Sequence, residues 1–517
     1  MTGKVDYLIV GGIVIDGTGA TAHAGHVGVK DGLIVDCGDH EPEAVVRLDA
    51  TGCIVSPGFI DAHSNISWGL FIDPACRILS FQGVTTAVTG NCGGSVFPVK
   101  GGAASWIQKA GSDYGVSPSW VGINDFADRV GPIGVDVLPM IGHGTARAAV
   151  AGFRNAPLPA EEITQLRGLI ADALQAGAWG LSFGLSYAPG MFADQEELVA
   201  CCSEAAELHR PCCFHIRIES DRLEEAVAEV IWLAEATHVR CVICHHKALG
   251  RANWGKVERT LKMISGANAR GCDIFLDLYP YTTALRNLAA LLPDWLHEGG
   301  RQRLVEKLTD RRQRPEIIAG LRENVRRWDA AWEDTIFWEA PASQEYLGRR
   351  ASEIVERSGE EGLLDMLLRN DGRVITLYEG ASAHDLREVA RYERTTVGSD
   401  GNAQHAGESG HPRSFATFPK FLAEFVINND VLSLDKAIWK MTGLPAQIYG
   451  LTDRGLIRAG LRADLCVFPL SSVEHAGGSQ HALDVPMPKH LLLAGQVIIE
   501  DGKQTGKLPG RVVLAQS

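Results

Sequence analysis

Eight short, strongly apolar runs recur through the middle of the chain, most of them separated by helical stretches. Such runs are typical of strands buried on both faces of a parallel sheet. Strands that alternate with helices predict βα units, and eight units predict an α/β fold of the (β/α)₈ barrel type. The predicted strands are Gly58–His63, Val84–Asn91, Val135–His143, Ala178–Leu185, Pro211–Ile218, Val239–His246, Asp273–Tyr279 and Thr395–Asp400.

The alternation is interrupted once, between the seventh and eighth predicted strands. More than a hundred residues lie there, with an Arg-rich and helical section at about 300–370. A structureless loop of that length is uncommon inside a compact domain. We therefore expect an inserted helical subdomain at about 285–372 that overhangs the barrel mouth as a lid.

Both ends of the chain have a β-rich texture. Residues 1–57 and the stretch from about 455 alternate short apolar runs with turn signals at Gly11–Gly12, Asp31–Gly32 and Asp501–Gly502. We expect the two ends to pair as one small sheet domain. The predicted boundaries are 1–57 plus 451–517 for this domain and 58–450 for the barrel.

The overall charge excludes some classes of partner. The chain has 49 Lys and Arg against 63 Asp and Glu, a net charge of −14, which argues against a nucleic-acid binder or a binder of anionic membranes. No signal-peptide pattern and no long apolar span are found. The 12 cysteines, scattered through predicted strands, favour buried thiols in a reducing cytoplasm. We expect a cytoplasmic protein with a small-molecule partner, and a homo-oligomer is left open.

Polar side chains recur at the C-terminal ends of the predicted strands, where barrels of this kind hold their catalytic groups. A single strand-end Cys or His is more often structural, and an Asp before Gly is often only a turn residue. The combination is what predicts a site, since every end except the fourth offers a ligand, acid or base. These residues are His63, Asn91–Cys92, His143, His215, Arg217, Cys244–Lys247, Tyr279–Tyr281 and Asp400.

A Cys and two His from three strands would form a tetrahedral zinc site with one position open for water. Zinc lowers the pKa of that water to roughly 7. Asp400 is the best-placed carboxylate to take the proton and pass it to a leaving nitrogen. Thiolate with imidazole favours zinc, with iron and cobalt left open.

Segments spread over nearly the whole chain match a known family. They are Pro57–His63, Gln82–Thr86, Gly90–Gly93, Gly142–Thr145, Gly184–Gly190, Phe214–Arg217, His245–Lys247, Asp277–Tyr281, Gly398–Gly401, His411–Arg413 and Gly455–Phe468. On these segments the sequence resembles the amidohydrolase superfamily, and within it the D-aminoacylases (N-acyl-D-amino-acid deacylases). The resemblance implies the TIM barrel, a flanking β-sandwich built from both termini, and the insert.

The resemblance also implies roles for individual residues. Cys92, His215 and His245 correspond to the zinc ligands of the family, and Asp400 corresponds to its catalytic acid and base. Apart from the resemblance, the mechanism that we expect has His63 or His143 stabilise the oxyanion. Lys247, Arg413, Tyr187 and Tyr281 fall where family members hold the substrate carboxylate, which suits the planar fork of Arg. The alternatives are a solvated strand-end charge for Lys247 and barrel-rim packing for the tyrosines.

One departure from the family concerns the first strand. Most amidohydrolases have His-x-His there, and this chain has His63–Ser64–Asn65. Because the Asn carbonyl is a weak neutral donor, we expect one zinc per chain and a second site that is weak or empty. Trp68 and Phe71 follow in place of a polar stretch and put aromatic rings near the metal. Two further histidines, His405 and His411, would contact substrate or be loop residues, and we favour a loop residue for His405.

These observations support three hypotheses about function. The first is deacylation of an N-acyl-D-amino acid or a similar N-acyl substrate. The second keeps the fold and changes the bond to a bulkier amide, a cyclic amide or a carbamate, as Trp68 suggests. The third is a non-catalytic relative that lost the His-x-His pair, against which the retained Cys92, His215, His245, Lys247 and Asp400 argue.

Overall fold

The computed structural model describes residues 4–37, 41–403, 410–476 and 486–516, and within them eight parallel strands close a barrel. β8 continues into β9 and β17 into β18, so the pairings run from β6 round to β17, and the contact of β18 with β6 completes the ring. All eight predicted strands are confirmed. Their bounds are β6 Phe59–Asn65, β7 Val84–Thr89, β8 Asp136–Pro139, β9 Ile141–Gly142, β10 Leu181–Gly184, β11 Cys212–His215, β12 Cys241–Ile243, β13 Ile274–Leu278, β17 Thr395–Val397 and β18 Gly401–Asn402.

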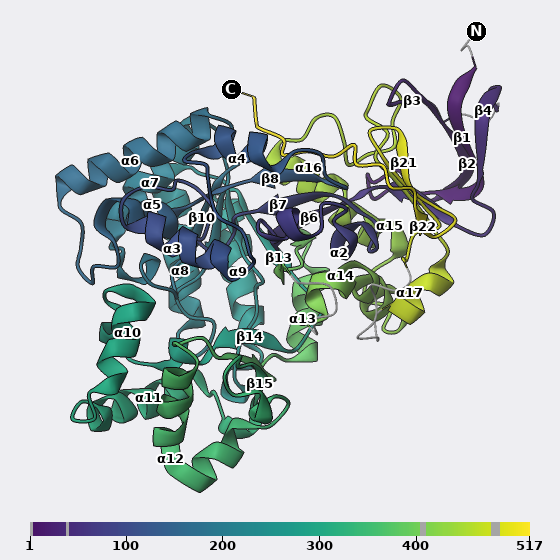
Figure 1. Ribbon diagram of the computed structural model, residues 1–517. Coiled ribbons are helices and arrows are strands. Elements are labelled where there is room, and N and C mark those ends of the chain that lie inside the picture. The colour runs from purple at the N-terminus through teal and green to yellow at the C-terminus, as the bar shows by residue number, and fades with distance from the viewer. Residues whose placement is uncertain (1–3, 38–40, 404–409, 477–485, 517) are drawn as a thin grey trace.

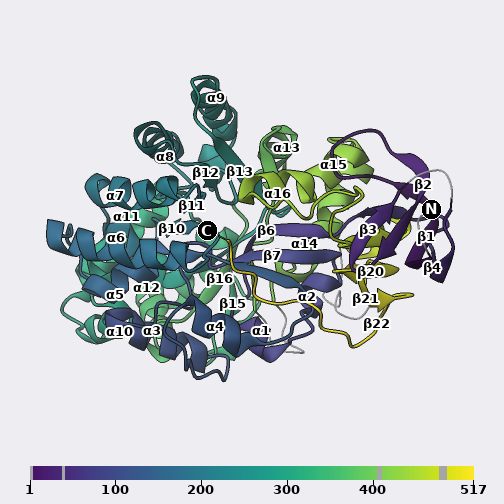
Figure 2. The ribbon, with the colours of Figure 1, turned by 90° about the horizontal axis from the view of Figure 1, so that it is seen from above.

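Helices surround the strands on the outside (Figures 1 and 2). α6 shows why they pack there, because its buried residues Ile163, Leu166, Ile170 and Leu174 recur every three or four positions and form one apolar stripe. The helices of the surrounding layer include α3 Gly101–Ser112, α4 Ile123–Val130, α5 His143–Ala151, α6 Ala160–Gln175, α7 Gln195–Glu207, α8 Leu223–Thr237, α9 Lys256–Ala269, α13 Ala383–Arg391, α14 Arg413–Leu422, α15 Leu434–Met441 and α16 Gly443–Tyr449.

The two ends of the chain share one nine-stranded sheet beside the barrel (Figures 1 and 2). The join is the antiparallel pairing of β19 with β5, and residues from both ends fill one apolar core. The predicted pairing of the ends is therefore present, whereas the domain boundaries stay predictions. The strands are β1 Val5–Val14, β2 His23–Lys30, β3 Leu33–Asp36, β4 Ala44–Asp49, β5 Ile54–Pro57, β19 Leu465–Phe468, β20 His490–Leu493, β21 Gln496–Glu500 and β22 Lys503–Gln504.

One of the three predicted turns is wrong. Gly11–Gly12 lies inside β1, where the register against β2 shifts between Ile9 and Gly12. Gly11 has φ 80°, so the pair forms a bulge in a continuous strand rather than a hairpin turn. Asp31–Gly32 and Asp501–Gly502 are turns as predicted, each between paired antiparallel strands.

The last described residues return to the barrel, which the sequence did not predict. Val512 pairs in parallel with Val137 of β8, and the Ala515 N–H donates to the Gly177 carbonyl at 2.9 Å. The Trp179 indole N–H donates to the Val513 carbonyl at 2.7 Å. The yellow C-terminal segment in Figures 1 and 2 thus runs from the terminal sheet back across the barrel.

The insert between β13 and β17 is a subdomain with a core of its own (Figure 1, bottom). The predicted helices are present, but the structure adds a three-stranded antiparallel sheet of order β14-β16-β15. Each of its strands has only four or five residues, too few for a clear alternation of apolar and polar side chains in the sequence. The elements are β14 Ala284–Asn287, α10 Gly300–Thr309, α11 Arg314–Trp328, β15 Thr335–Glu339, α12 Ala351–Arg369 and β16 Ile375–Tyr378.

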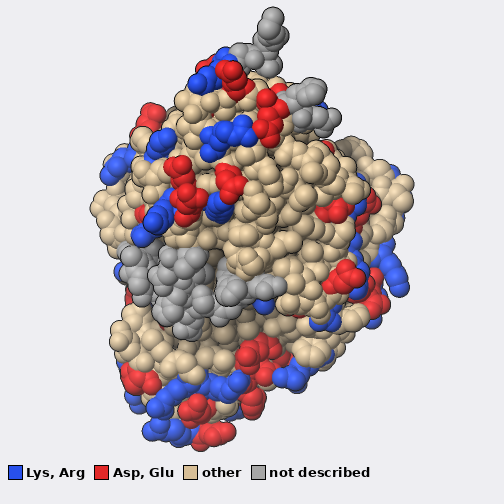
Figure 3. Space-filling model, turned by 90° about the vertical axis from the view of Figure 1, so that its right-hand side faces the viewer, with Lys and Arg blue, Asp and Glu red and all other residues tan. Residues whose placement is uncertain are grey.

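The surface shows charges of both signs. On the face in Figure 3, Lys and Arg alternate with Asp and Glu toward the two ends, and neither sign forms a continuous patch. Within the part of the chain that the structure describes, no helix has the length and apolar character needed to cross a membrane.

Candidate active site

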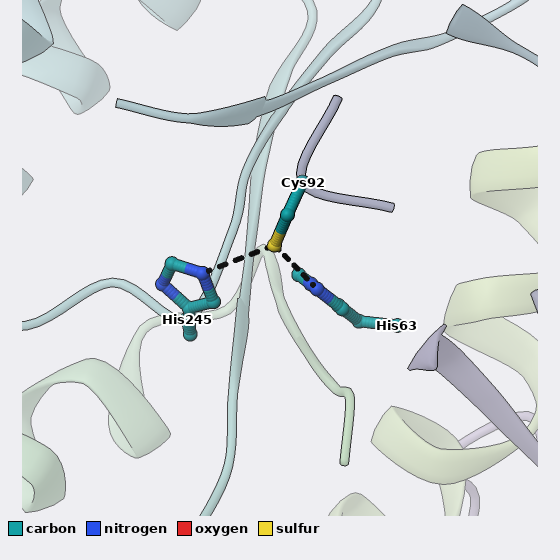
Figure 4. Close-up of side chains that lie close together, drawn as sticks. All are labelled: His63, Cys92 and His245. Atoms are coloured by element: carbon teal, nitrogen blue, oxygen red, sulfur yellow. Dashed lines mark hydrogen bonds between the residues drawn. The ribbon is translucent and has the colours of Figure 1, made fainter. Parts of the chain in front are cut away.

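Cys92, His215 and His245 meet at the C-terminal ends of the barrel strands. Cys92 follows β7, His215 ends β11, and His245 follows β12. The Cys92 Sγ lies 3.8 Å from His215 Nδ1 and 3.8 Å from His245 Nε2, and the two nitrogens are 2.8 Å apart. Figure 4 shows Cys92 pointing between His245 and His63. Three strands thus bring one sulfur and two nitrogens together, as the sequence predicted.

This donor set fits a single tetrahedral metal ion. Zn–S bonds of about 2.3 Å and Zn–N bonds of about 2.0–2.1 Å place neighbouring donors roughly 3.3–3.7 Å apart. The observed separations bracket that range. Burial raises the pKa of the Cys92 thiol, but the facing imidazoles, His63 foremost, outweigh it and hold the pKa well below its ordinary value. The thiolate, the form that binds metal, is therefore favoured.

The backbone at this site is strained. Cys92, His245 and Asp400 all adopt positive φ angles, of 53°, 35° and 47°. Residues with a Cβ avoid this region, and such strain persists where the surrounding structure holds it, often at functional sites. Three strand ends thus turn sharply to aim their side chains at one point.

The fourth strand end carries no ligand because it makes room for Cys92. A Cβ on Gly184, the last residue of β10, would lie 2.1 Å from the Cys92 carbonyl oxygen. Any side chain there would push the Cys92 loop away. The exception in the sequence pattern is therefore a packing requirement of the Cys92 loop.

Asp400 lies beside this donor set and is held by three neighbours. Its carboxylate accepts from Asn65 Nδ2 at 2.8 Å and pairs with Arg413 Nη1 at 2.7 Å and with His63 Nε2 at 3.5 Å. Burial raises the Asp400 pKa, but Arg413 and His63 outweigh it and keep the pKa well below its ordinary value. The side-chain amide of Asn65 thus helps to hold the Asp400 carboxylate in place by donating a hydrogen bond to it.

Two acidic residues orient the imidazoles, and neither was predicted from the sequence to have a role. Asp277 accepts from the His245 backbone N–H at 2.6 Å and contacts His63 Nδ1 at 3.1 Å. Glu219 contacts His245 Nδ1 at 2.9 Å and pairs with Lys247 Nζ at 2.6 Å. With Nδ1 occupied, His245 presents Nε2 to Cys92 Sγ and His215 Nδ1. The sequence held a clue to each: Glu219 is a carboxylate four residues after His215, and Asp277 begins the matched segment Asp277–Tyr281.

Two cavities open at this mouth and share Tyr187, Leu285, Arg286, Asp400 and Arg413. One, of about 80 Å³, extends past His215, His245 and Lys247. The other, of about 1030 Å³, extends past Cys92 and Asn65 and runs between the barrel and the insert. β14 and β15 supply part of its wall. The insert therefore contributes directly to the cavity that Cys92 lines.

Not every predicted residue lies on these cavities. Tyr187 and Trp68 line them, whereas Phe71 stacks on Trp120 at 5.3 Å away from the mouth. Tyr281 packs against His411 at 5.2 Å between ring centroids and lines neither cavity. His405 falls outside the described residues.

His143 lies with partners of its own. Its Nε2 contacts Glu197 at 2.8 Å, and Glu197 also pairs with Arg147, all three side chains being fully buried. His143 lines neither cavity. Its role as an oxyanion donor stays a prediction, and its contacts are those of a buried hydrogen-bonded cluster.

Arg286 of β14 is a cavity residue that the sequence did not reveal. Its guanidinium carbon lies 4.9 Å from the Tyr378 ring centroid and 5.4 Å from that of Trp328. Among the residues that the structure describes, no carboxylate lies within ion-pair distance of it. Arg413 and Lys247, by contrast, already pair with Asp400 and Glu219. Arg286 is thus a cation at the junction of the cavities with free capacity for an anion.

Comparison with known proteins places these features in a family. The model of the amidohydrolase family matches residues 386–499. An N-acyl-D-glutamate deacylase of Alcaligenes xylosoxydans xylosoxydans is 32% identical over 99% of this chain and 97% of its own length. The Bordetella bronchiseptica N-acyl-D-glutamate deacylase, solved with zinc and a phosphonate inhibitor, has a TM-score of 0.83 at 28% identity, covering 99% of this chain and 100% of that one.

A solved D-aminoacylase adds information on metal stoichiometry. It has a TM-score of 0.81 at 28% identity and covers 99% of this chain and 100% of its own. That D-aminoacylase has a binuclear metal centre, with activation by one metal and attenuation by the second. With this likeness over the full length, the predicted family is confirmed: the chain belongs to the D-aminoacylases of the amidohydrolase family.

Proposed function

We propose that this chain is a zinc-dependent deacylase that hydrolyses the amide bond of an N-acyl amino acid, of the N-acyl-D-amino acid type. The observation that carries the proposal is Asp400, a buried carboxylate set beside one thiolate and two imidazoles at the mouth of a barrel. The deacylase activity of the relatives and the zinc in a solved one support it.

The residues of this chain would divide the work as follows. Cys92, His215 and His245 would hold the zinc, which supplies Lewis acidity toward the amide carbonyl and an acidified water. Asp400 would accept a proton from the attacking water and deliver it to the leaving nitrogen. His63, fixed through Nδ1 by Asp277, directs Nε2 at the same space and would donate to the developing oxyanion.

Binding of the substrate would also strengthen the base. In the described state Arg413 pairs with Asp400 and depresses its pKa. A substrate carboxylate that shares the Arg413 guanidinium would weaken this pairing and raise the proton affinity of Asp400. The carboxylate would be held by Arg413, Lys247 and Tyr187, as predicted, and by Arg286.

The second metal position is proposed to stay weak. His63 remains available, but Asn65 offers a metal only a carbonyl oxygen, a weak neutral donor, while its N–H donates to Asp400. One zinc per chain is sufficient for the roles above.

The test is release of free amino acid from a panel of N-acyl-D-amino acids by zinc-loaded enzyme. Chelation should abolish turnover and zinc should restore it. Ring opening of cyclic amides or cleavage of carbamates, with no release of amino acid from the panel, would favour the second hypothesis. Zinc below roughly half an equivalent after gentle purification would revive the non-catalytic one.

We also propose a cytoplasmic location for this protein. The buried free thiols suit a reducing cytoplasm. The described part of the site is built entirely from side chains of one chain, so we propose that the monomer holds a complete site. Light scattering coupled to activity measurement at falling protein concentration tests this.

A further inference from the structure

The two cavities at the barrel mouth differ greatly in volume, and they meet at Asp400. The smaller is walled by charged side chains, among them Lys247, Glu219 and Arg217. Beyond the residues that the two cavities share, the larger adds four aromatic rings, those of Trp68, Trp106, Tyr114 and Trp338, and four charged side chains, those of Asp113, Arg301, Glu339 and Arg373. If Asp400 is to reach both the water and the leaving nitrogen, the scissile amide lies at the junction, and its two halves extend into different cavities.

Cavity volume and the position of Lys247 assign the halves. The amine half of an N-acyl amino acid carries a carboxylate, and the smaller cavity offers Lys247 together with the shared residues Arg286 and Arg413. Its volume, about 80 Å³, suits a compact group. The acyl half is then directed past Cys92 and Asn65 into the cavity of about 1030 Å³.

That cavity is far larger than a small acyl group needs. Pockets of roughly 300–1000 Å³ bury entire drug-sized ligands. Aromatic rings line two sides of the cavity. Trp68 and Tyr114 stack at 6.4 Å between centroids and 12° between planes on the barrel side, and Trp338 of β15 lines the insert side. Arg373 joins the two sides, pairing with Asp113 after α3 at 3.2 Å and with Glu339 of β15 at 3.3 Å.

We propose that the larger cavity is an acyl subsite and that the preferred substrates carry a bulky aromatic acyl group, of the arylacetyl or aroyl class. This inference rests on the proposed deacylase function. An aromatic acyl group would bury its ring against Trp68, Tyr114 and Trp338, where aromatic pairs add to the gain from apolar burial. A short acyl group would leave these walls in water.

The experiment compares N-phenylacetyl and N-acetyl derivatives of the same two amino acids, D-alanine and D-glutamate, by the release of free amine. We expect kcat/KM to be at least about tenfold higher for the phenylacetyl substrate. Trp338→Ala should lower the phenylacetyl-to-acetyl ratio by roughly tenfold, and Tyr114→Ala is the second variant. The matched control is Trp232→Ala on α8, a tryptophan that is 37% exposed and lines neither cavity.

A binding measurement separates this inference from the proposed function. Zinc-loaded enzyme is titrated calorimetrically with phenylacetate and with acetate. Tighter binding of phenylacetate that Trp338→Ala weakens supports the subsite even if no amide is cleaved, in which case only the deacylase function fails. Equal binding of the two acids, or equal kcat/KM for the two acyl groups with active enzyme, overturns the acyl subsite and leaves the deacylase function standing.

Discussion

Asp400 and Asn65 show how one changed residue redistributes roles at the site. In the usual first-strand pair, both side chains serve metal, whereas here Asn65 donates to the carboxylate that is proposed to move protons. The change therefore affects both the metal count and the orientation of the base. Two substitutions separate these effects.

Asp400→Asn should keep the zinc and lose turnover. The amide is nearly isosteric but cannot accept a proton, so we expect kcat to fall by at least about 10²-fold, the usual size of a general-base contribution. Metal analysis should still give about one zinc per chain, because Cys92, His215 and His245 remain. A fully active variant would rule out the assigned role.

Asn65→His should raise the zinc content from about one toward two per chain. An imidazole at this position restores the first-strand pair with His63, and imidazole is a far better ligand than an amide carbonyl. Mass spectrometry of the metals after dialysis measures the change, with Asn65→Gln as the control that adds length but no imidazole. A metal content unchanged from the parent would show that Asn65 does not limit the second site.

His411 predicts acid sensitivity. Its Nδ1 accepts from the Arg413 N–H at 3.0 Å, so Nε2 carries the hydrogen that it shares with Thr283 at 2.8 Å. Burial, followed by the charge of Arg413, lowers the His411 pKa from 6.5 to about 3. The unfolded state therefore binds the proton first, and stability falls as the pH drops from about 6.5 toward about 3. Urea unfolding across this range should show a shallower pH dependence for His411→Gln.

Among single residues, the sequence indicated the side chains that gather at the site more clearly than the residues that orient them. Cys92, His215, His245 and Asp400 stand at strand ends, so strand prediction alone brought them together. Glu219, Asp277 and Arg286 depend on loop paths and on the insert, which no periodicity reveals. Tyr281 follows the end of its strand and yet packs against His411, because the position of a strand end does not fix the direction of the chain that leaves it.

Among the elements, the insert departs most from prediction. Its helices were expected, but β14, β15 and β16 put a sheet against the barrel mouth and carry Arg286 and Trp338 into the cavity wall. Only long-range pairing defines that sheet, since β14 and β16 are separated by nearly the whole insert. The contact of this subdomain with the barrel can be tested separately from catalysis.

Arg373→Gln should loosen the insert without unfolding it. The substitution removes the positive charge that pairs with Asp113 on the barrel side, and a partly exposed pair of this kind contributes about 1 kcal/mol or less. Hydrogen exchange in peptides from 284–378 should rise roughly two- to fivefold. Arg369→Gln is the matched control, because Arg369 pairs with Glu345 inside the insert. Equal exchange in both variants would contradict a linking role for Arg373.

For the whole molecule, the C-terminal segment ties the barrel to the terminal sheet. Deleting residues 508–517 removes the pairing of Val512 with Val137 and leaves the Trp179 indole N–H without its partner. Each lost hydrogen bond costs about 1 kcal/mol, and buried apolar contacts are lost as well. We expect the melting temperature to fall by roughly 3–6 °C. Scanning calorimetry measures it, with deletion of Ser517 alone as the control.

The sheet shared by both ends cannot be completed until the C-terminal strands have been synthesised. Ser56 of β5 and Cys466 of β19, which meet across the strand pair, are 410 residues apart in sequence. At about 5–20 residues per second, β5 leaves the ribosome on the order of 20–80 s before the strand that covers its free edge. During that interval the N-terminal strands present an unpaired edge and an unfilled apolar face. A nascent chain of this protein is therefore a natural client for chaperones that shield such edges until translation ends.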